Sequence, residues 1–333
     1  MDESKAKYHH LVPKTYMSAW ANESGTLQVE FLDKPDVLVP RNKENIAGIT
    51  DYHSIKAGML ICTEEDTKKI FSPVSEYIVM IDGEIVSDTM KLNQCYDNFD
   101  KWVIKRKDGS LVKKKEIKRE IEKIKVRDIE ANWAQKYENK WNGVLLELES
   151  CILAAQTATI TAIHKEYLMK FFVALDWRSL QSNQEFIQAF QLFEKILSPY
   201  EVPKDSQILP SLKTYADYYK HNLLLKYYRQ YLNDEGVIYI NAIKNMENTN
   251  FHFLVADGQT RFFASDNPAF TYLRNDYLKM GIMPITPQIL LTQGHCTTDA
   301  DKYYITHISE DKVKEYNQII KDNASNSVIH PYV

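Results

Sequence analysis

Apolar and polar positions follow two different periods along this chain, and the period changes twice. Near the N-terminus, residues 27–31 alternate between apolar and polar side chains. Alternation places the two kinds of side chain on opposite faces of a strand, so a β-hairpin is predicted over residues 26–40. Further on, Asp82-Gly83 separates the apolar runs 77–81 and 84–86. Asp-Gly between apolar runs is typical of a tight hairpin turn and predicts a second hairpin.

Between residues 113 and 232 the apolar positions recur every three or four residues, which is the spacing of one helix face. Examples are Ile117, Ile121 and Ile124, then Trp133, Tyr137 and Trp141, then Phe186, Phe190 and Phe193. After Gly236 short β-branched and aromatic runs return. They predict strands at residues 237–240, 251–255, 261–264, 289–292 and 303–306.

The expected fold class is therefore α+β, with a helical central region flanked by N- and C-terminal β elements. Those two sets of strands are candidates for one shared antiparallel or mixed sheet. The 333 residues are 44% apolar and 26% charged, as in a folded globular protein. We expect one domain over residues 1–333, with the basic segment 101–127 as a candidate protruding insertion.

Composition also restricts the class of protein. No stretch of the sequence has the length and apolar character of a membrane span or a secretory signal, so we expect no membrane and a cytoplasmic location. The four cysteines form no Cys-x-x-Cys pair, which fits reduced thiols and argues against a zinc knuckle. The sequence leaves the oligomeric state open.

The charge distribution is uneven. The chain carries a net charge of -4, but residues 101–127 contain twelve basic and four acidic side chains, a net charge of +8 against -12 for the remainder. Such a segment is commonly a solvated helical surface, and it can also hold the phosphates of a nucleic acid. The candidate contacts to the nucleic-acid backbone are Lys105, Arg106, Lys113, Lys114, Lys115, Lys118 and Arg119.

Residues 8–20 combine two histidines, a proline, two tyrosines and a tryptophan. Chain ends fray unless they are held, so this aromatic mass is expected to be buried or to line a pocket. His10 is a candidate general acid or base at neutral pH. Adjacent residues of an extended segment point to opposite sides, so His9 and His10 are not expected to bind one metal. We predict no metal site.

Three further places offer polar chemistry. Ser265-Asp266-Asn267-Pro268 follows a predicted strand and presents a carboxylate and an amide on a turn, where Asp266 either orients a water or caps its own turn. Arg178 lies on an apolar helix, where a guanidinium needs an acidic or phosphate partner. A structural ion pair is the more common explanation of such a buried charge. The run Asp51-Tyr52-His53-Ser54 is a third polar cluster, not specific for any chemistry.

These pieces occur in an order that resembles the domain-of-unknown-function family numbered 4238. The matching features are His-His-x-Val-Pro-x-x-Tyr at 9–16 with Trp20, then Tyr52, Arg178, Ser-Asp-Asn-Pro at 265–268, Met-Pro-x-x-Pro at 283–287 and Asn-x-x-Ile-x-x-x-Ala at 317–324. The chain departs from the family in its basic segment and in Ala264, where the family usually carries threonine. The resemblance implies a bacterial, defence-associated protein that acts on invading nucleic acid.

We therefore predict a metal-independent hydrolase without a cofactor that acts on phage or other foreign DNA. His10 and Asp266 are the predicted acid–base or water-orienting groups, with Asn267 contacting the substrate. The remaining predicted substrate contacts are His9, Tyr16, Tyr52 and Arg178.

A DNA glycosylase ranks above a nuclease, because the sequence shows no cluster of carboxylates for divalent cations and has 21 tyrosines, 13 phenylalanines and 5 tryptophans available for stacking. The alternatives are a non-catalytic binding module, in which the N-terminal segment and the turn after Ala264 pack on each other, and a toxin aimed at a nucleotide or tRNA.

Overall fold

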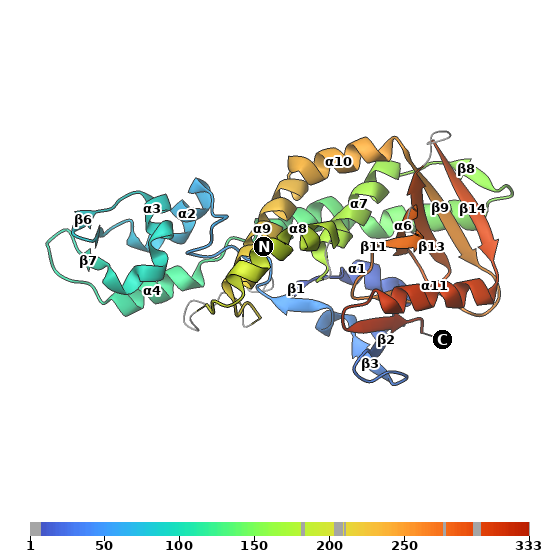
Figure 1. The fold of residues 1–333 in the computed structure, drawn as a ribbon, viewed down its shortest axis with the longest axis horizontal. Coiled ribbons are helices and arrows are strands. Elements are labelled where there is room, and N and C mark those ends of the chain that lie inside the picture. Colours follow the sequence, from blue (N-terminus) through green and yellow to red (C-terminus); the bar gives the residue numbers. More distant parts are fainter. Residues whose placement is uncertain are drawn as a thin grey trace. The chain divides into compact units, whose positions relative to one another are not determined.

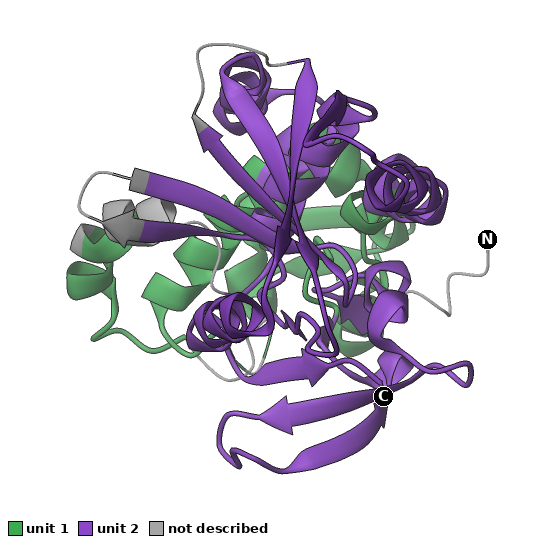
Figure 2. Cartoon of the chain, turned by 90° about the vertical axis from the view of Figure 1, so that its right-hand side faces the viewer, with its two compact units in different colours: residues 1–7, 51–131, 190–227 green, residues 8–50, 132–189, 228–333 purple. Residues whose placement is uncertain are grey.

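The chain forms two compact units, each built from segments that are separated in the sequence (Figures 1 and 2). The structure is a computed structural model that describes residues 8–180, 184–202, 209, 211–275, 278–295 and 301–332. Unit 1 contains residues 51–131 and 190–227, and unit 2 contains residues 8–50, 132–189 and 228–333. The sequence predicted a single domain over residues 1–333, which stays a prediction. Each of the two units encloses apolar side chains of its own.

Unit 1 contains a three-stranded antiparallel sheet in the order β6-β5-β7. The predicted hairpin at Asp82-Gly83 is confirmed, since β5 and β6 pair around it. The strands and helices of this part are α2 (Glu64–Ile70), β5 (Ile78–Ile81), β6 (Glu84–Ile85), α3 (Thr89–Gln94), β7 (Val103–Lys105) and α4 (Lys114–Lys123). The helices α5 (Asp128–Trp133), α8 (Gln184–Leu197) and α9 (Tyr215–Leu232) each contribute residues to both units.

The basic segment 101–127 is an integral part of unit 1. Its strand β7 pairs with β5, and α4 buries Ile117 and Ile121. Val126 then exchanges two backbone hydrogen bonds of 2.9 Å with Ile55. The segment is therefore folded as part of unit 1, and its protrusion as an insertion stays a prediction.

Unit 2 is centred on a six-stranded sheet in the order β11-β12-β13-β9-β14-β8, in which only β9 and β14 run parallel. Its strands are β8 (Thr159–Thr161), β9 (Thr249–Ala256), β11 (Phe270–Asn275), β12 (Leu278–Pro284), β13 (Ile289–His295) and β14 (Lys302–Ile308). The helix α11 (Glu310–Asp322) packs Val313 and Ile320 against Leu254, Ile282 and Leu290 of this sheet. The other helices are α6 (Asn139–Leu153), α7 (Lys165–Arg178) and α10 (Gly236–Met246).

A second sheet of unit 2 joins strands from both ends of the chain. Its order is β10-β15-β2-β3, with β2 (Thr26–Phe31), β3 (Leu38–Asn42), β10 (Ala264–Ser265) and β15 (Ser327–His330). The predicted N-terminal hairpin is confirmed as β2 and β3. The N-terminal residues add a short pair of strands, β1 (Tyr8–His10) and β4 (Gly48–Thr50), and the helix α1 (Lys14–Met17).

The α+β class is confirmed, and two predicted strands are wrong. Residues 237–240 lie in the helix α10, whose Ala242 is buried while Val237 and Ile240 are exposed. A short apolar run does not distinguish a strand from a helical segment, and here the helix formed. Of residues 261–264, only Ala264 belongs to a strand.

Within the part of the chain that the structure describes, no helix is long and apolar enough to cross a membrane. Cys62, Cys95 and Cys151 form no disulfide among the described residues, and Cys296 lies outside those residues.

Candidate functional site

Side chains of the N-terminal motif are bonded to backbone groups of distant segments of unit 2. The indole Nε1 of Trp20 donates to the carbonyl of Phe262 at 2.9 Å, and the hydroxyl of Tyr16 donates to the carbonyl of Pro284. Both side chains are buried. Tyr16 and Trp20 therefore tie the start of the chain to the segments around 262 and 284, which is a structural role.

Asp266 binds the backbone of a turn that lies far along the chain. Its carboxylate accepts hydrogen bonds from the backbone N–H groups of Ser325 and Asn326 at 2.8 Å and of Ser327 at 3.2 Å. Burial raises the pKa of Asp266, and these backbone donors oppose that rise. Asp266 therefore stabilises the connection between α11 and β15. None of these hydrogen bonds involves His10.

Asn267 has a similar task. Its amide donates to the carbonyl of Asn323 at 2.9 Å, at the C-terminal end of α11. The hydroxyl of Ser265 donates to the carbonyl of Asn267 within the same turn. The Ser-Asp-Asn sequence thus fixes a loop in unit 2, while Oδ1 of Asn267 is buried without a hydrogen-bond partner among the described residues. The roles in water activation and substrate contact stay predictions.

The structure brings two of the predicted residues, His10 and Arg178, together. Nε of Arg178 donates to the backbone carbonyl of His10 at 2.7 Å. Burial lowers the pKa of the His10 imidazole, and the nearby charge of Lys14 adds to this, so the ring is neutral at pH 7. His9 is buried in β1, where it pairs with Ile49 of β4. Tyr52, another predicted contact, belongs to unit 1.

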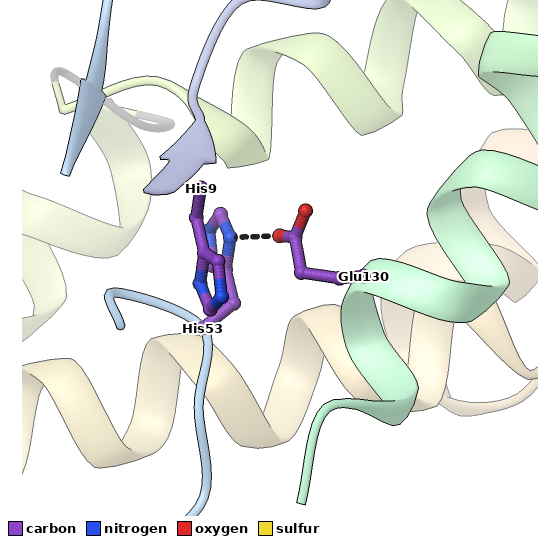
Figure 3. A group of neighbouring side chains, drawn as sticks. All are labelled: His9, His53 and Glu130. Carbon is purple, nitrogen blue, oxygen red and sulfur yellow. Dashed lines mark hydrogen bonds and ion pairs between the residues drawn. The ribbon is translucent and has the colours of Figure 1, made fainter. Parts of the chain in front are cut away.

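Unit 1 contains a buried polar group that the sequence only partly indicated, here named the His53 cluster: Asp51, Tyr52, His53, Glu130 and His221. Nδ1 of His53 lies 2.5 Å from Oε1 of Glu130, as drawn in Figure 3. An ionised carboxylate can only accept, so Nδ1 carries the hydrogen and the imidazole is held in one tautomer. The His53 side chain is 1% exposed and that of Glu130 is 18% exposed.

The end of the basic segment supports this cluster. Nζ of Lys125 forms an ion pair with Asp51, and Nη2 of Arg127 lies 3.5 Å from the same carboxylate. Burial opposes ionisation of Asp51, but the bond and charge of Lys125 outweigh it, so the pKa of Asp51 is lowered. Asp51 has a φ of 58°, a left-handed conformation that Asp tolerates better than most residues. These contacts fix the backbone two residues before His53.

The helix α9 supplies His221 to the cluster. The Tyr52 ring has His53 at 5.0 Å and His221 at 4.8 Å between centroids. Burial, followed by the charges of His53 and Lys56, lowers the pKa of His221 to about 3. Burial lowers the pKa of Lys56 to about 8, helped by Lys125 and opposed by Asp51. His221 is therefore a neutral imidazole, and Lys56 is partly neutral near pH 8.

The arrangement pairs an oriented imidazole with a carboxylate that is partly accessible, which is suited to moving a proton. Both are also ligand types for divalent metals, which take four or more ligands. The sequence drew attention to residues 51–54 through their polar run. It gave no signal for Glu130 or His221, which look like ordinary polar positions of helices.

The seven predicted phosphate contacts are placed differently from one another. Lys114 donates to the carbonyl of Asp100 and Lys118 lies 6.0 Å from the centre of the Phe99 ring, so both are used inside unit 1. Lys113 pairs with Glu116, and Arg106 donates to Ser110. Lys105 is half-buried on β7, paired with Ile78. Lys115 and Arg119 are exposed on α4 and have no ion pair with any described residue.

A family model described as a protein of unknown function, DUF4238, matches residues 8–331 of the chain. Neither the curated proteins nor the solved structures include a match.

Proposed function

We propose, for a chain that belongs to the DUF4238 family of proteins of unknown function, that it hydrolyses foreign DNA through Glu130 and His53. One observation supports the proposal above all. The basic segment ends at Lys125 and Arg127, which bind Asp51 two residues before His53. A surface suited to phosphates and a buried acid–base pair are therefore parts of one folded unit.

Glu130 is the group of this pair that reaches solvent, so it is the proposed general base. It takes a proton from a water, the water oxygen bonds to the sugar carbon, and the bond from that carbon to the base breaks. The base leaves with the electron pair and is then protonated. His53 is a positioning residue, because its Nδ1–H donates to the Glu130 carboxylate and fixes the orientation of that group.

Hydrolysis of the N-glycosidic bond ranks above cleavage of the phosphodiester. Phosphodiester cleavage commonly recruits divalent cations between clustered carboxylates. The second carboxylate of the cluster, Asp51, is bound by Lys125 and by the hydroxyl of Ser54. A single accessible carboxylate that can orient a water suits a glycosylase better.

Lys115 and Arg119 are the proposed contacts to the DNA backbone, since they are exposed and four positions apart on α4. Phage DNA is the substrate to test first. That choice rests on the resemblance to defence-associated proteins and not on the geometry.

The experiment incubates the full-length protein with plasmid DNA and with modified phage DNA, in EDTA and in magnesium, and scores abasic sites and nicks. The wild type is expected to produce abasic sites, and Glu130→Gln to lower the rate about 100-fold or more. Glu147→Gln is the matched control, because Glu147 forms a similar pair with His164 at 2.7 Å in unit 2. That control should keep the wild-type rate.

The proposal fails if neither substrate is damaged in either buffer, or if Glu130→Gln is as active as the wild type. Nicks without abasic sites would indicate a nuclease. Retained DNA binding without any lesion would favour the non-catalytic binding module, which the structural roles of Trp20 and Asp266 also suit.

A further inference from the structure

Two lysines of unit 1 stand opposite each other in a short antiparallel pairing. The backbones of Ile55 and Val126 exchange two hydrogen bonds of 2.9 Å. In an antiparallel register the next pair, here Lys56 and Lys125, lies directly opposite, with both side chains on one face. The side chains of Ile55 and Val126 point to the other face, where both are buried. Like charges in this arrangement repel each other, so the placement of Lys56 calls for a reason.

One carboxylate serves the other two cations of this place. Asp51 forms an ion pair with Nζ of Lys125, and Nη2 of Arg127 lies 3.5 Å from the same carboxylate. The side chains of Asp51, Lys125 and Arg127 are only 10%, 20% and 19% exposed. Asp51 also accepts from the hydroxyl of Ser54. Lys56 is therefore a half-buried amine beside a group that is largely removed from water.

These surroundings favour the neutral form of the Lys56 amine. Burial lowers its pKa to about 8, and the charges of Lys125 and Arg127 add to this effect while Asp51 opposes it. An unperturbed lysine has a pKa of about 10.4, so at pH 8 the neutral fraction of Lys56 is roughly 100 times larger. A desolvated lysine next to another cation is an activated nucleophile towards carbonyl carbons. The hydrolysis assigned to Glu130 does not use this amine.

We propose that Lys56 forms an imine with the aldehyde of an abasic site in DNA and cleaves the strand there. The amine nitrogen bonds to C1′ of the opened sugar, and the carbonyl oxygen leaves as water with one proton from the amine and one from solvent. A proton of C2′ then passes to water. Its electron pair forms the C2′–C3′ double bond, and the C3′–O bond breaks with its pair on the phosphate. Water finally replaces the nitrogen at C1′ and restores the amine.

The inference rests on the proposed function, because an abasic site is the product of the hydrolysis assigned to Glu130. Both residues belong to unit 1. The chemistry of Lys56 is nevertheless a separate step, since it begins from the aldehyde and needs no base to be removed. It can therefore be tested on DNA that already contains the abasic site.

The test incubates the full-length protein at pH 8 with a DNA duplex that contains one abasic site, in the presence of sodium borohydride. Borohydride reduces an imine to a stable secondary amine, so protein and DNA become covalently joined. Peptide mapping by mass spectrometry is expected to find the joined sugar on Lys56. Lys56→Arg keeps the positive charge but forms no imine, and it should lower the yield of the joined product about 100-fold.

Lys170→Arg is the matched control. Lys170 is also a poorly exposed lysine, with 16% of its side chain accessible, but it lies in unit 2 and binds Glu166 at 2.6 Å. The ion pair holds its amine in the charged form, and its pKa is raised despite burial. Lys170→Arg should therefore be joined to the DNA as efficiently as the wild type.

The outcomes separate this inference from the proposed function. A product on Lys56 supports the inference even if the protein makes no abasic sites in plasmid or phage DNA. Abasic sites in those substrates without any product on Lys56 would overturn the inference and leave the hydrolysis standing. A product on another residue, or an undiminished yield with Lys56→Arg, also overturns it. Mapping of the wild type decides the question even where Lys56→Arg does not fold, which circular dichroism detects.

Discussion

At the scale of single residues, the side chains that the sequence singled out divide into those that hold the backbone and those that offer chemistry. Asp266, Asn267, Tyr16 and Trp20 all bind backbone groups of other segments. The sequence could predict that Asp266 lies on a turn, because Asp and Asn before proline favour one. It could not predict the partners at 323–327, because those contacts depend on how α11 and β15 are folded onto the turn.

Replacing Asp266 should reduce stability. In Asp266→Asn the side-chain NH2 group replaces one carboxylate oxygen and faces at least one of the three backbone N–H donors, and the negative charge of the side chain is lost. We expect the free energy of unfolding to fall by about 2–4 kcal/mol, because the hydrogen bonds are charge-assisted and buried. Urea unfolding of the two proteins measures the difference. Asp108→Asn is the control, since Asp108 also accepts from a backbone N–H but is exposed.

A loss in Asp266→Asn no larger than that in Asp108→Asn would contradict the structural role and favour the catalytic one.

The His53 cluster could be predicted from the sequence only in part. Its first three residues were visible as a polar run, but Glu130 is 77 positions from His53 and His221 comes from α9. Only folding shows that they belong together.

At the scale of elements, local turn chemistry decided which predictions succeeded. The hairpin of β5 and β6 is specified by Asp82 and Gly83, both with positive φ, which is what such a turn needs. Residues 237–240 had no comparable signal. Their β-branched side chains favour strands by propensity, yet the segment after Gly236, whose φ is 82°, continues as the helix α10.

Glu30 joins three elements of unit 2, and its ionisation should make their association depend on pH. This buried carboxylate on β2 binds Lys321 of α11 at 2.6 Å and His330 of β15 at 2.9 Å. Burial alone would raise its pKa, but the bonds from Lys321, the Asp36 amide and His330 outweigh burial and lower the pKa from 4.5 to about 2. The folded state therefore favours the charged form.

A lowered pKa stabilises the folded protein above the unfolded value and loses that effect as the pH falls through the folded value. We expect Glu30→Gln to cost about 2 kcal/mol at pH 7, and the difference from the wild type to shrink as the pH falls from about 4.5 towards 2. Unfolding by urea at several pH values measures this. A difference that stays constant over that range would show that the charge of Glu30 contributes nothing.

At the scale of the whole molecule, the resemblance and the proposed chemistry belong to different units. Every motif residue quoted for the family lies in unit 2 except Tyr52. Several of these residues specify the internal bonding of unit 2, so a sequence pattern that identifies the family describes mainly its framework. The basic segment, which the family pattern does not explain, lies wholly in unit 1. This division is why the sequence predicted the fold class well and the pairing of His53 with Glu130 poorly.

Two units with separate cores should also unfold separately, and the tryptophans allow this to be measured. Trp102 is the one tryptophan of unit 1, while Trp20, Trp133, Trp141 and Trp177 belong to unit 2. In denaturant, far-ultraviolet circular dichroism should show two transitions, one for each unit. The fluorescence of the Trp102→Phe protein should show only the transition of unit 2, because its remaining tryptophans lie there. Trp102→Phe should also move the other transition to lower denaturant, because its N–H donates to the Cys95 carbonyl. If circular dichroism and fluorescence instead show the same single transition in both proteins, the two units unfold as a single cooperative body.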